Sequence, residues 1–244
     1  MIINSEPNIR QLNELETWLK QEFDTSKEGF YCNWNTIQKS FKRNQLITCS
    51  INDEIVGFIS WSTNSKRQYV DIDIFEIHPK FRQLGYGKRL YQLGETYFKS
   101  KDFKAVILFC EPRESEPFWR KMNFIKFPPR GYSESDLYYY RPLIEVNLPV
   151  DEATDNKLEL WDMQPYAING KRPKWIWDIN SNSQPVLHPC NGDWNLRLTK
   201  KGVVLKEDRV KCFDNTEDIL LGPLLYLDTR KYFYESKTEV RNKE

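Results

Sequence analysis

A glycine-bearing turn lies between a strand-like run and a helical pattern in this 244-residue chain. The turn reads Arg-Gln-Leu-Gly-Tyr-Gly over residues 82–87 and follows a β-branched and aromatic run at 69–77. The first N–H groups of a helix have no partner inside it, and the helix dipole adds partial positive charge there. Glycine lets a ligand approach the backbone closely. The pattern therefore predicts an anion site, for which phosphate is the commonest occupant.

Helical and strand-like segments surround this turn. Apolar residues at helical spacing predict helices at residues 9–23, 34–44, 87–101 and 115–122. Runs of β-branched and aromatic residues predict strands at 45–51, 55–61, 69–77, 104–110, 124–127 and 137–144. Asn52-Asp53 is expected to join the first two strands as a hairpin turn. The apolar run at 105–110 is of the kind that a sheet buries on both faces.

The composition gives no general case for binding nucleic acid or a membrane. Lys and Arg number 36 against 35 Asp and Glu, a formal net charge of +1. No long apolar run is present, and the N-terminus lacks a basic segment followed by an apolar one, so neither a transmembrane helix nor a signal peptide is expected. The five cysteines include no Cys-x-x-Cys pair and there are two histidines, so we expect no metal site. A cytoplasmic protein with reduced thiols is the simplest interpretation.

The composition changes after a polar, acidic segment at 148–157, which is a candidate linker. Beyond it, tryptophans lie among short β-like runs and turn signals such as Asn169-Gly170 and Lys201-Gly202. Strands are predicted at 173–179, 194–198, 203–205 and 210–213, and a strand or short helix at 219–226. We therefore expect two domains, residues 1–147 and a small β-rich domain at 158–234.

Two motifs in the first domain resemble those of the GNAT superfamily of N-acetyltransferases. Residues 82–87 match its (R/Q)-x-x-G-x-(G/A) acyl-CoA motif at every specified position. Residues 118–124, Phe-Trp-Arg-Lys-Met-Asn-Phe, resemble its Phe-Tyr-x-Lys-x-Gly-Phe motif, and the predicted elements follow the order of that superfamily. The resemblance implies an α+β (mixed α/β) fold, with a mostly antiparallel, splayed sheet flanked by helices. It also implies acetyl-CoA as co-substrate.

The resemblance places the coenzyme A pyrophosphate over the backbone N–H groups of residues 83–88. The pantetheine arm then lies along the long strand, where it splays from the strand at 105–110, and the N–H of Ile77 polarises the thioester carbonyl. The residues that this assigns to the cofactor site are Phe75, Ile77, Arg82, Gln83, Leu84, Gly85, Tyr86, Gly87, Lys88, Arg89 and Trp119.

The same resemblance implies an acid on the long strand as the catalytic base. Asp71, Asp73 and Glu76 are the candidates, and the first two match better by their spacing from the strand end. Period-two alternation places Asp71 and Asp73 on one face of the strand and Glu76 on the other. The alternative is that these carboxylates simply face water at a strand edge.

The general acid is less well marked. Trp119 stands where many members have a tyrosine, and an indole cannot act as a proton acid. Either another group protonates the thiolate or it leaves without a dedicated acid. The tyrosines near the expected end of the sheet are Tyr132, Tyr138, Tyr139 and Tyr140. Each of these tyrosines is more commonly a packing residue. Cys110 is a conceivable nucleophile, but a buried free cysteine is the commoner explanation.

The resulting hypothesis is an N-acetyltransferase in which an amine attacks acetyl-CoA directly in a ternary complex. Its acceptor is a small-molecule amine or a protein amine, with no nucleic acid, membrane or metal involved, and the chain is a possible homodimer. The alternative is a catalytically silent GNAT fold that binds acyl-CoA as a sensor or protein-interaction module. A dinucleotide fingerprint is excluded because Leu90 replaces its third glycine.

Overall fold

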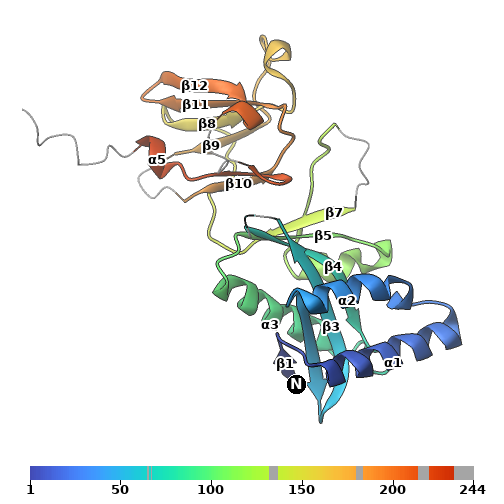
Figure 1. Ribbon diagram of the computed structural model, residues 1–244. Coiled ribbons are helices and arrows are strands. Elements are labelled where there is room, and N and C mark those ends of the chain that lie inside the picture. Colours follow the sequence, from blue (N-terminus) through green and yellow to red (C-terminus); the bar gives the residue numbers. More distant parts are fainter. Residues whose placement is uncertain (65, 67, 132–136, 180–183, 214–219, 234–244) are drawn as a thin grey trace, which may run out of the picture. The chain divides into compact units, whose positions relative to one another are not determined.

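The computed structural model describes residues 1–64, 66, 68–131, 137–179, 184–213 and 220–233 (Figure 1). The chain divides into two compact units. The first comprises Met1–Lys126 and Leu137–Ile144, and the second comprises Phe127–Asp136 and Glu145–Glu244. Each unit has its own hydrophobic core, and each is described by itself below.

The first unit contains a seven-stranded sheet in the order β1-β2-β3-β4-β5-β7-β6. The strands are β1 (Ile2–Asn4), β2 (Leu46–Ile51), β3 (Glu54–Thr63), β4 (Tyr69–Ile77), β5 (Ala105–Phe109), β6 (Ile125–Lys126) and β7 (Tyr138–Pro142). Only β4 and β5 pair in parallel, and every other pairing is antiparallel. The predicted mixed, mostly antiparallel sheet is therefore confirmed, and β1 is an edge strand that the sequence patterns did not indicate.

Helices cover both faces of this sheet. They are α1 (Ile9–Ser26), α2 (Trp34–Lys42), α3 (Tyr86–Ser100) and α4 (Glu116–Lys121), with 3-10 turns η1 (Phe30–Asn33), η2 (Pro79–Phe81) and η3 (Arg113–Ser115). α1 begins at a capping box, because the Asn8 side chain accepts from the Gln11 N–H while the Gln11 side chain accepts from the Asn8 N–H, both at 3.1 Å.

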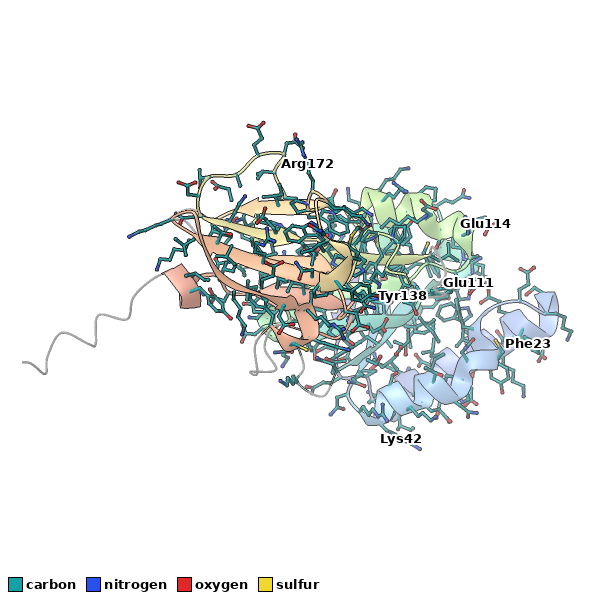
Figure 2. All side chains as sticks on the ribbon, turned by 90° about the horizontal axis from the view of Figure 1, so that it is seen from above. Phe23, Lys42, Glu111, Glu114, Tyr138 and Arg172 are labelled. Carbon is teal, nitrogen blue, oxygen red and sulfur yellow. The ribbon has the colours of Figure 1, made fainter. Side chains whose placement is uncertain are left out.

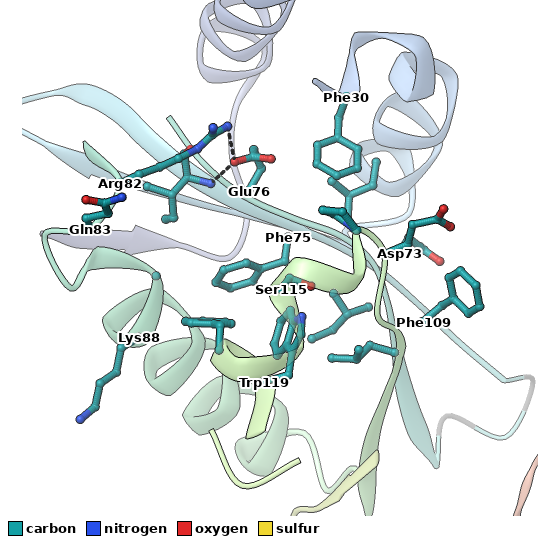
Figure 3. Close-up of a pocket in the computed structure, with 18 of the residues that line it drawn as sticks. Phe30, Asp73, Phe75, Glu76, Arg82, Gln83, Lys88, Phe109, Ser115 and Trp119 are labelled. Carbon is teal, nitrogen blue, oxygen red and sulfur yellow. Dashed lines mark hydrogen bonds and ion pairs between the residues drawn. The ribbon is translucent and has the colours of Figure 1, made fainter. Parts of the chain in front are cut away.

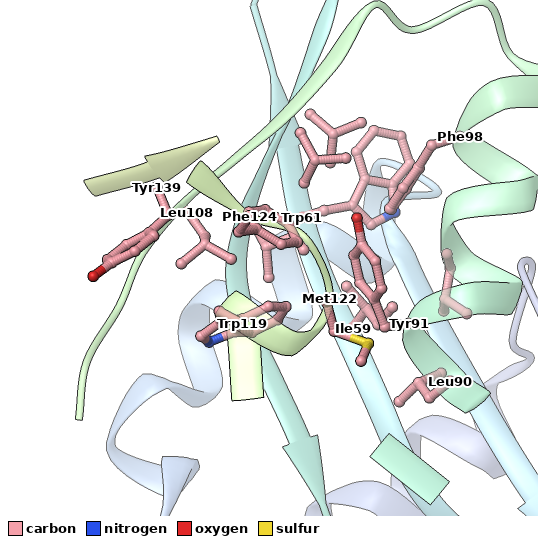
Figure 4. Close-up of a cluster of buried hydrophobic side chains, with 14 of the residues drawn as sticks. Ile59, Trp61, Leu90, Tyr91, Phe98, Leu108, Trp119, Met122, Phe124 and Tyr139 are labelled. Atoms are coloured by element: carbon pink, nitrogen blue, oxygen red, sulfur yellow. The ribbon is translucent and has the colours of Figure 1, made fainter. Parts of the chain in front are cut away.

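The two faces of the sheet have different cores. Apolar residues of α1 and α2 pack on one face against β2, β3 and β4, with Leu15, Leu19 and Ile37 fully buried. The other face packs on α3 and α4 and is rich in aromatic rings (Figure 4). There, Trp61 lies edge-on to Phe98 with 5.4 Å between ring centroids. This double coverage explains why β3 and β5 are nearly continuous apolar runs.

The second unit contains two small sheets. One has the order β12-β11-β8-β9 and the other β10-β14-β13. Their strands are β8 (Lys157–Leu160), β9 (Trp175–Asp178), β10 (Val186–Pro189), β11 (Asn195–Lys200), β12 (Val203–Arg209), β13 (Leu220–Leu221) and β14 (Leu224–Leu227); η4 (Pro165–Ala167), η5 (Val210–Cys212) and α5 (Arg230–Phe233) complete the unit. The predicted β-rich character is confirmed.

One local expectation for this unit was wrong, and two of its strands were not expected. The segment predicted as a strand at 210–213 is the 3-10 turn η5, because Val210 and Phe213 are both buried three residues apart and the Phe213 N–H donates to the Val210 carbonyl. The strands β8 and β10 were missed. β10 contains His188 and ends at Pro189, which are weak strand formers.

The segment expected to be a linker, 148–157, is hydrogen-bonded to β9. The Val150 N–H donates to the Ile176 carbonyl at 2.7 Å, and the Thr154 hydroxyl donates to Asp178 at 2.6 Å. The boundary between the units lies earlier, between Ile144 and Glu145. Whether the two units fold independently, as the predicted domains 1–147 and 158–234 require, stays a prediction.

Candidate functional site

A cavity opens where β4 and β5 diverge. The two strands pair in parallel until Ile72 lies opposite Leu108, and beyond that pair β4 continues alone to Ile77. The cavity has a volume of about 490 Å³ and is lined from the second half of β4, the turn before α3, the end of β5 and α4 (Figure 3). The carboxyl ends of neighbouring parallel strands are a common position for a ligand site.

The turn before α3 forms one end of the cavity. Gly85 is the N-cap of α3 with a left-handed backbone (φ 83°), and no side chain caps the helix there. Its neighbour Gln83 also has positive φ (63°). A Cβ atom on Gly87 would meet Phe118 of α4 at 3.4 Å, so the helix start is closely flanked on that side. The N-cap residue therefore provides no side-chain acceptor for the first N–H groups of α3.

Most residues expected in the cofactor site line this cavity. They are Phe75, Ile77, Arg82, Gln83, Gly85, Gly87, Lys88 and Trp119. Three do not. Leu84 is 63% exposed, the Tyr86 ring lies against Phe81 with 6.0 Å between centroids, and Arg89 is exposed on α3. A helix has 3.6 residues per turn, so Tyr86 and Arg89 cannot share the direction of Gly87 and Lys88.

The Arg82 side chain is held by protein groups. Its Nε donates to the Ile77 carbonyl at 3.0 Å, and its Nη2 lies 3.1 Å from both the Glu76 and Glu22 carboxylates. Glu22 belongs to α1, 60 residues earlier in the chain. Arg82 therefore ties the turn to β4 and α1.

The N–H of Ile77, expected to polarise the thioester, donates to the Glu76 carboxylate at 2.8 Å. In the same ladder the His78 N–H donates to Val56 of β3. Amide directions alternate along a strand, so the N–H groups of Ile77 and Phe75 both point away from β3 and toward the divergence. Phe75 thus presents a second backbone donor at the cavity.

β4 contains a β-bulge at Asp73. Ser60 of β3 pairs with Ile74, but its neighbour Trp61 pairs with Ile72, so Asp73 is an extra residue. Ser60 hydrogen-bonds to α2 and Trp61 packs against α3, so these two residues lie on opposite faces. Their partners Ile74 and Ile72 must therefore also lie on opposite faces. In a regular strand, two residues that are two positions apart share one face. The bulge therefore reverses the alternation that the sequence predicts.

All three candidate acids consequently lie on one face of β4. Asp71 pairs with Ser62, and the Ser62 hydroxyl donates to the Asp73 carboxylate at 3.1 Å. Glu76 pairs with Phe58, which lies on the α1 side, and its carboxylate faces α1. The expectation that Glu76 takes the opposite face was wrong, because the extra residue at the bulge shifts the period. Asp73 and Glu76 line the cavity and Asp71 does not.

The pKa values of these acids are all raised. Burial, and then the charge of Asp73, raises the pKa of Asp71 to about 7. Desolvation raises the pKa of Asp73, and Arg43 opposes the shift. Burial raises the pKa of Glu76 against the opposing charge of Arg82. Perturbed carboxyl groups of this kind gather at functional sites.

Aromatic and hydroxyl groups of α4 and η3 form the wall of the cavity that faces β4. Trp119 is buried and lies edge-on to Phe75 with 5.1 Å between ring centroids. Ser115 lines the cavity, and its hydroxyl lies 3.3 Å from the thiol sulfur of Cys110. Burial raises the pKa of that thiol, which makes it a poor nucleophile.

The tyrosines considered as proton donors do not line the described cavity. Tyr139 and Tyr140 are buried, and burial raises the pKa of each to about 12. Tyr138 lies edge-on to Phe109 with 5.2 Å between ring centroids. Tyr132 lies outside the described residues.

The sequence reasoning missed part of the lining. Phe30 of η1, Phe109 and Glu111 at the end of β5, and Ser115 all contribute to it. The position of Phe109 and Glu111 after a parallel strand next to β4 was a usable signal. Phe30 had none, because it comes from a loop after α1 whose course depends on the packing of α1.

Among the described residues, no group of three or more His, Cys, Asp or Glu side chains is placed to hold a metal ion. Nor does that part of the chain contain a helix with the length and apolar character needed to cross a membrane.

Comparison with known proteins finds a family match within the first unit. Residues 9–124 match the acetyltransferase (GNAT) family. This match agrees with the resemblance of the two motifs, and it does not extend into residues 125–244. No curated protein matches the chain.

Several solved structures are similar to it, each over 59% of this chain. Ard1 of Thermoplasma volcanium is 20% identical, with 98% of that chain covered and a TM-score of 0.45. The aminoglycoside 6'-N-acetyltransferase of Enterococcus faecium is 14% identical, with 98% covered and a TM-score of 0.46. A GNAT family N-acetyltransferase of Escherichia coli, in complex with CoA, is 11% identical, with 81% covered and a TM-score of 0.47.

Proposed function

We propose that this protein is an acetyl-CoA-dependent N-acetyltransferase in which an amine attacks the thioester directly. The observation that carries this proposal is one cavity at the divergence of β4 and β5. It has uncapped helix amides and a left-handed glycine at one end and the Asp73 carboxylate at the other. The match of residues 9–124 to the acetyltransferase (GNAT) family supports the same reaction class.

The residues at the turn fit the pyrophosphate of coenzyme A. The N–H groups at the start of α3 provide donors, and Lys88 adds a positive charge. Gly85 leaves open space, because a Cβ atom there would meet nothing within 4 Å. Acetyl-CoA supplies the acetyl group as a thioester, and the rings of Phe75, Phe118 and Trp119 offer an apolar wall to the arm that carries it.

Asp73 is the proposed base. It lines the cavity at the bulge of β4, whereas Asp71 does not, and Glu76 is held by Arg82 and the Ile77 N–H. The acceptor amine forms the new N–C bond, its proton passes to the Asp73 carboxylate, and the C–S bond breaks to release coenzyme A thiolate. A raised pKa suits this role, because a more basic carboxylate accepts a proton more readily.

Backbone and hydroxyl donors stabilise the developing charges in this proposal. The Phe75 N–H points toward the divergence and is placed to donate to the thioester oxygen, while the Ile77 N–H is occupied by Glu76. The Ser115 hydroxyl is the proposed hydrogen-bond donor to the departing thiolate. It takes the place of the tyrosine that Trp119 replaces.

The acceptor is an amine of a small molecule or a protein in this proposal, and the enzyme works in the cytoplasm. The second unit is an accessory domain that shapes the acceptor side, binds a protein or dimerises. Light scattering on the purified full chain measures the last of these directly.

The test follows free thiol while the protein is incubated with acetyl-CoA and a broad panel of amines. We expect thiol release with at least one amine and its loss in Gly85→Trp, because the indole occupies the phosphate cradle and the backbone is left-handed. Gly170→Trp is the matched control. Gly170 has a similar φ (71°) and open space, but it lies in the second unit.

Two outcomes contradict the proposal. One is acetyl-CoA binding with no thiol release on any amine. The other is a melting temperature that acetyl-CoA does not raise, because a ligand that binds only the folded state must raise it.

A further inference from the structure

Charge is separated along the cavity. Lys88, Gln83 and the helix amides lie at one end, and Asp73 lies with Phe30 and Phe109 at the other (Figure 3). Glu111 follows β5 and also lines the cavity, two residues after Phe109. Among the described lining residues at this second end, which we call the acceptor end, there are two carboxylates and no basic side chain. Arg43 acts on Asp73 but does not line the cavity.

The acceptor end also carries aromatic surface. Phe109 is 39% exposed, although it stands at the end of a strand whose other residues are buried. Tyr138 supports its ring from the neighbouring strand β7 at 5.2 Å. Phe30 is half-buried and belongs to η1. An exposed ring beside a cavity is an apolar contact for a bound molecule.

We propose that the acceptor is a primary amine on an aromatic or other apolar body, without a carboxylate beside the amine. This inference rests on the function proposed above. An ammonium group is attracted by Asp73 and Glu111 before it gives up its proton. A carboxylate next to the amine is repelled by the same two negative charges. Free amino acids are therefore excluded by charge, and Phe30 and Phe109 contact the body of the accepted amine.

Three amines of similar size separate charge from shape. Phenethylamine has no substituent beside the amine, phenylalanine has a carboxylate there, and phenylalaninamide has a neutral group of almost the same shape. We expect kcat/KM for phenethylamine and phenylalaninamide to exceed that for phenylalanine by about 100-fold, because two like charges on the protein oppose the carboxylate of phenylalanine. Calorimetric binding of the same three molecules to the CoA-loaded protein should give the same order.

Matched variants test which residues cause the selectivity against a carboxylate beside the amine. Glu111→Gln should reduce the difference in kcat/KM between phenylalanine and its amide about tenfold, and Glu111→Lys should reduce this difference further. Glu114→Gln is the control, because Glu114 lies in η3, three residues after Glu111 (both are labelled in Figure 2), and is exposed but does not line the cavity. Phe109→Ala should raise KM for phenethylamine about tenfold and leave that for ethylamine unchanged.

The possible results point in different directions. If phenylalanine is used or bound as well as its amide, the inference on the acceptor is overturned and the proposed function stands. If no amine of any class releases thiol although acetyl-CoA binds, the proposed function fails. The inference on the acceptor is tested separately by calorimetry, and equal binding of the three amines overturns it. If Glu111→Gln and Glu114→Gln behave alike, Glu111 is not a determinant and the proposal is contradicted.

Discussion

Arg82 and Glu76 form an ion pair of 3.1 Å across the turn between β4 and α3. Arg82 is the first residue of the motif that resembles an acyl-CoA motif, and the resemblance assigns it to the cofactor site without fixing where its charge points. Its guanidinium also binds Glu22 of α1 and the Ile77 carbonyl. The charge of Arg82 therefore holds the turn against β4 and α1, and our proposal assigns the phosphate to the N–H groups of the turn itself.

Arg82→Gln should loosen this turn. We expect KM for acetyl-CoA to rise about tenfold and stability to fall by about 1 kcal/mol, because the pair is part of a partly exposed network. Arg89→Gln is the control, since Arg89 is exposed and does not line the cavity. Kinetics and urea unfolding of the single variants provide the measurements.

A double-variant cycle separates positioning from direct phosphate contact. If Arg82 acts through Glu22, adding Arg82→Gln to a Glu22→Gln variant should do little more than either change alone. Fully additive effects on KM, with a salt dependence that disappears in Arg82→Gln, would show that Arg82 binds phosphate itself.

Asp73→Asn should remove the base. We expect kcat to fall by about 10² to 10⁴, the range for a lost general base, while the affinity for coenzyme A stays unchanged. Glu76→Gln should act differently, by weakening the turn and raising KM for acetyl-CoA through Arg82. Steady-state kinetics with calorimetric binding of coenzyme A distinguish the two. Retention of kcat in Asp73→Asn would move the role to Asp71.

Asp71 should make stability depend on pH. Its pKa is raised to about 7 by burial and by Asp73, so between about pH 4 and pH 7 the folded chain binds more protons than the unfolded chain. The contribution of Asp71 to the free energy of unfolding is therefore fully present below pH 4 and is lost as the pH rises through 7. Its upper bound is about 4 kcal/mol. Denaturant unfolding from pH 4 to pH 8 should show a flatter profile in Asp71→Asn. An unchanged profile would mean that Asp71 titrates normally.

Sequence alone was sufficient for the parts of the site that depend on local chemistry. β4 is observed at the predicted residues, because its β-branched and aromatic residues are interrupted only by acids and end at His78-Pro79. The start of α3 was also predicted, because Gly85 and Gly87 mark the turn and Leu90 and Tyr91 begin the buried face.

Long-range pairing explains what the sequence could not predict. The bulge at Asp73 arises from the register of β4 against β3, and no local pattern in β4 shows which residue will be skipped. The direction of Arg82 depends on Glu22, which is 60 residues away. The contribution of Phe30 to the cavity depends likewise on where α1 ends.

Ser115→Ala tests how the thiolate leaves. Its hydroxyl lines the cavity beside Cys110, so we expect kcat with acetyl-CoA to fall by about 10- to 100-fold, with partial recovery in Ser115→Thr. An acetyl thioester of an aromatic thiol should show a smaller loss, because that thiolate leaves without help. Cys110→Ala should keep most activity, since the thiol is buried and its pKa is raised. Abolished turnover in Cys110→Ala, with Ser115→Ala active, would instead indicate a covalent acetyl-cysteine route.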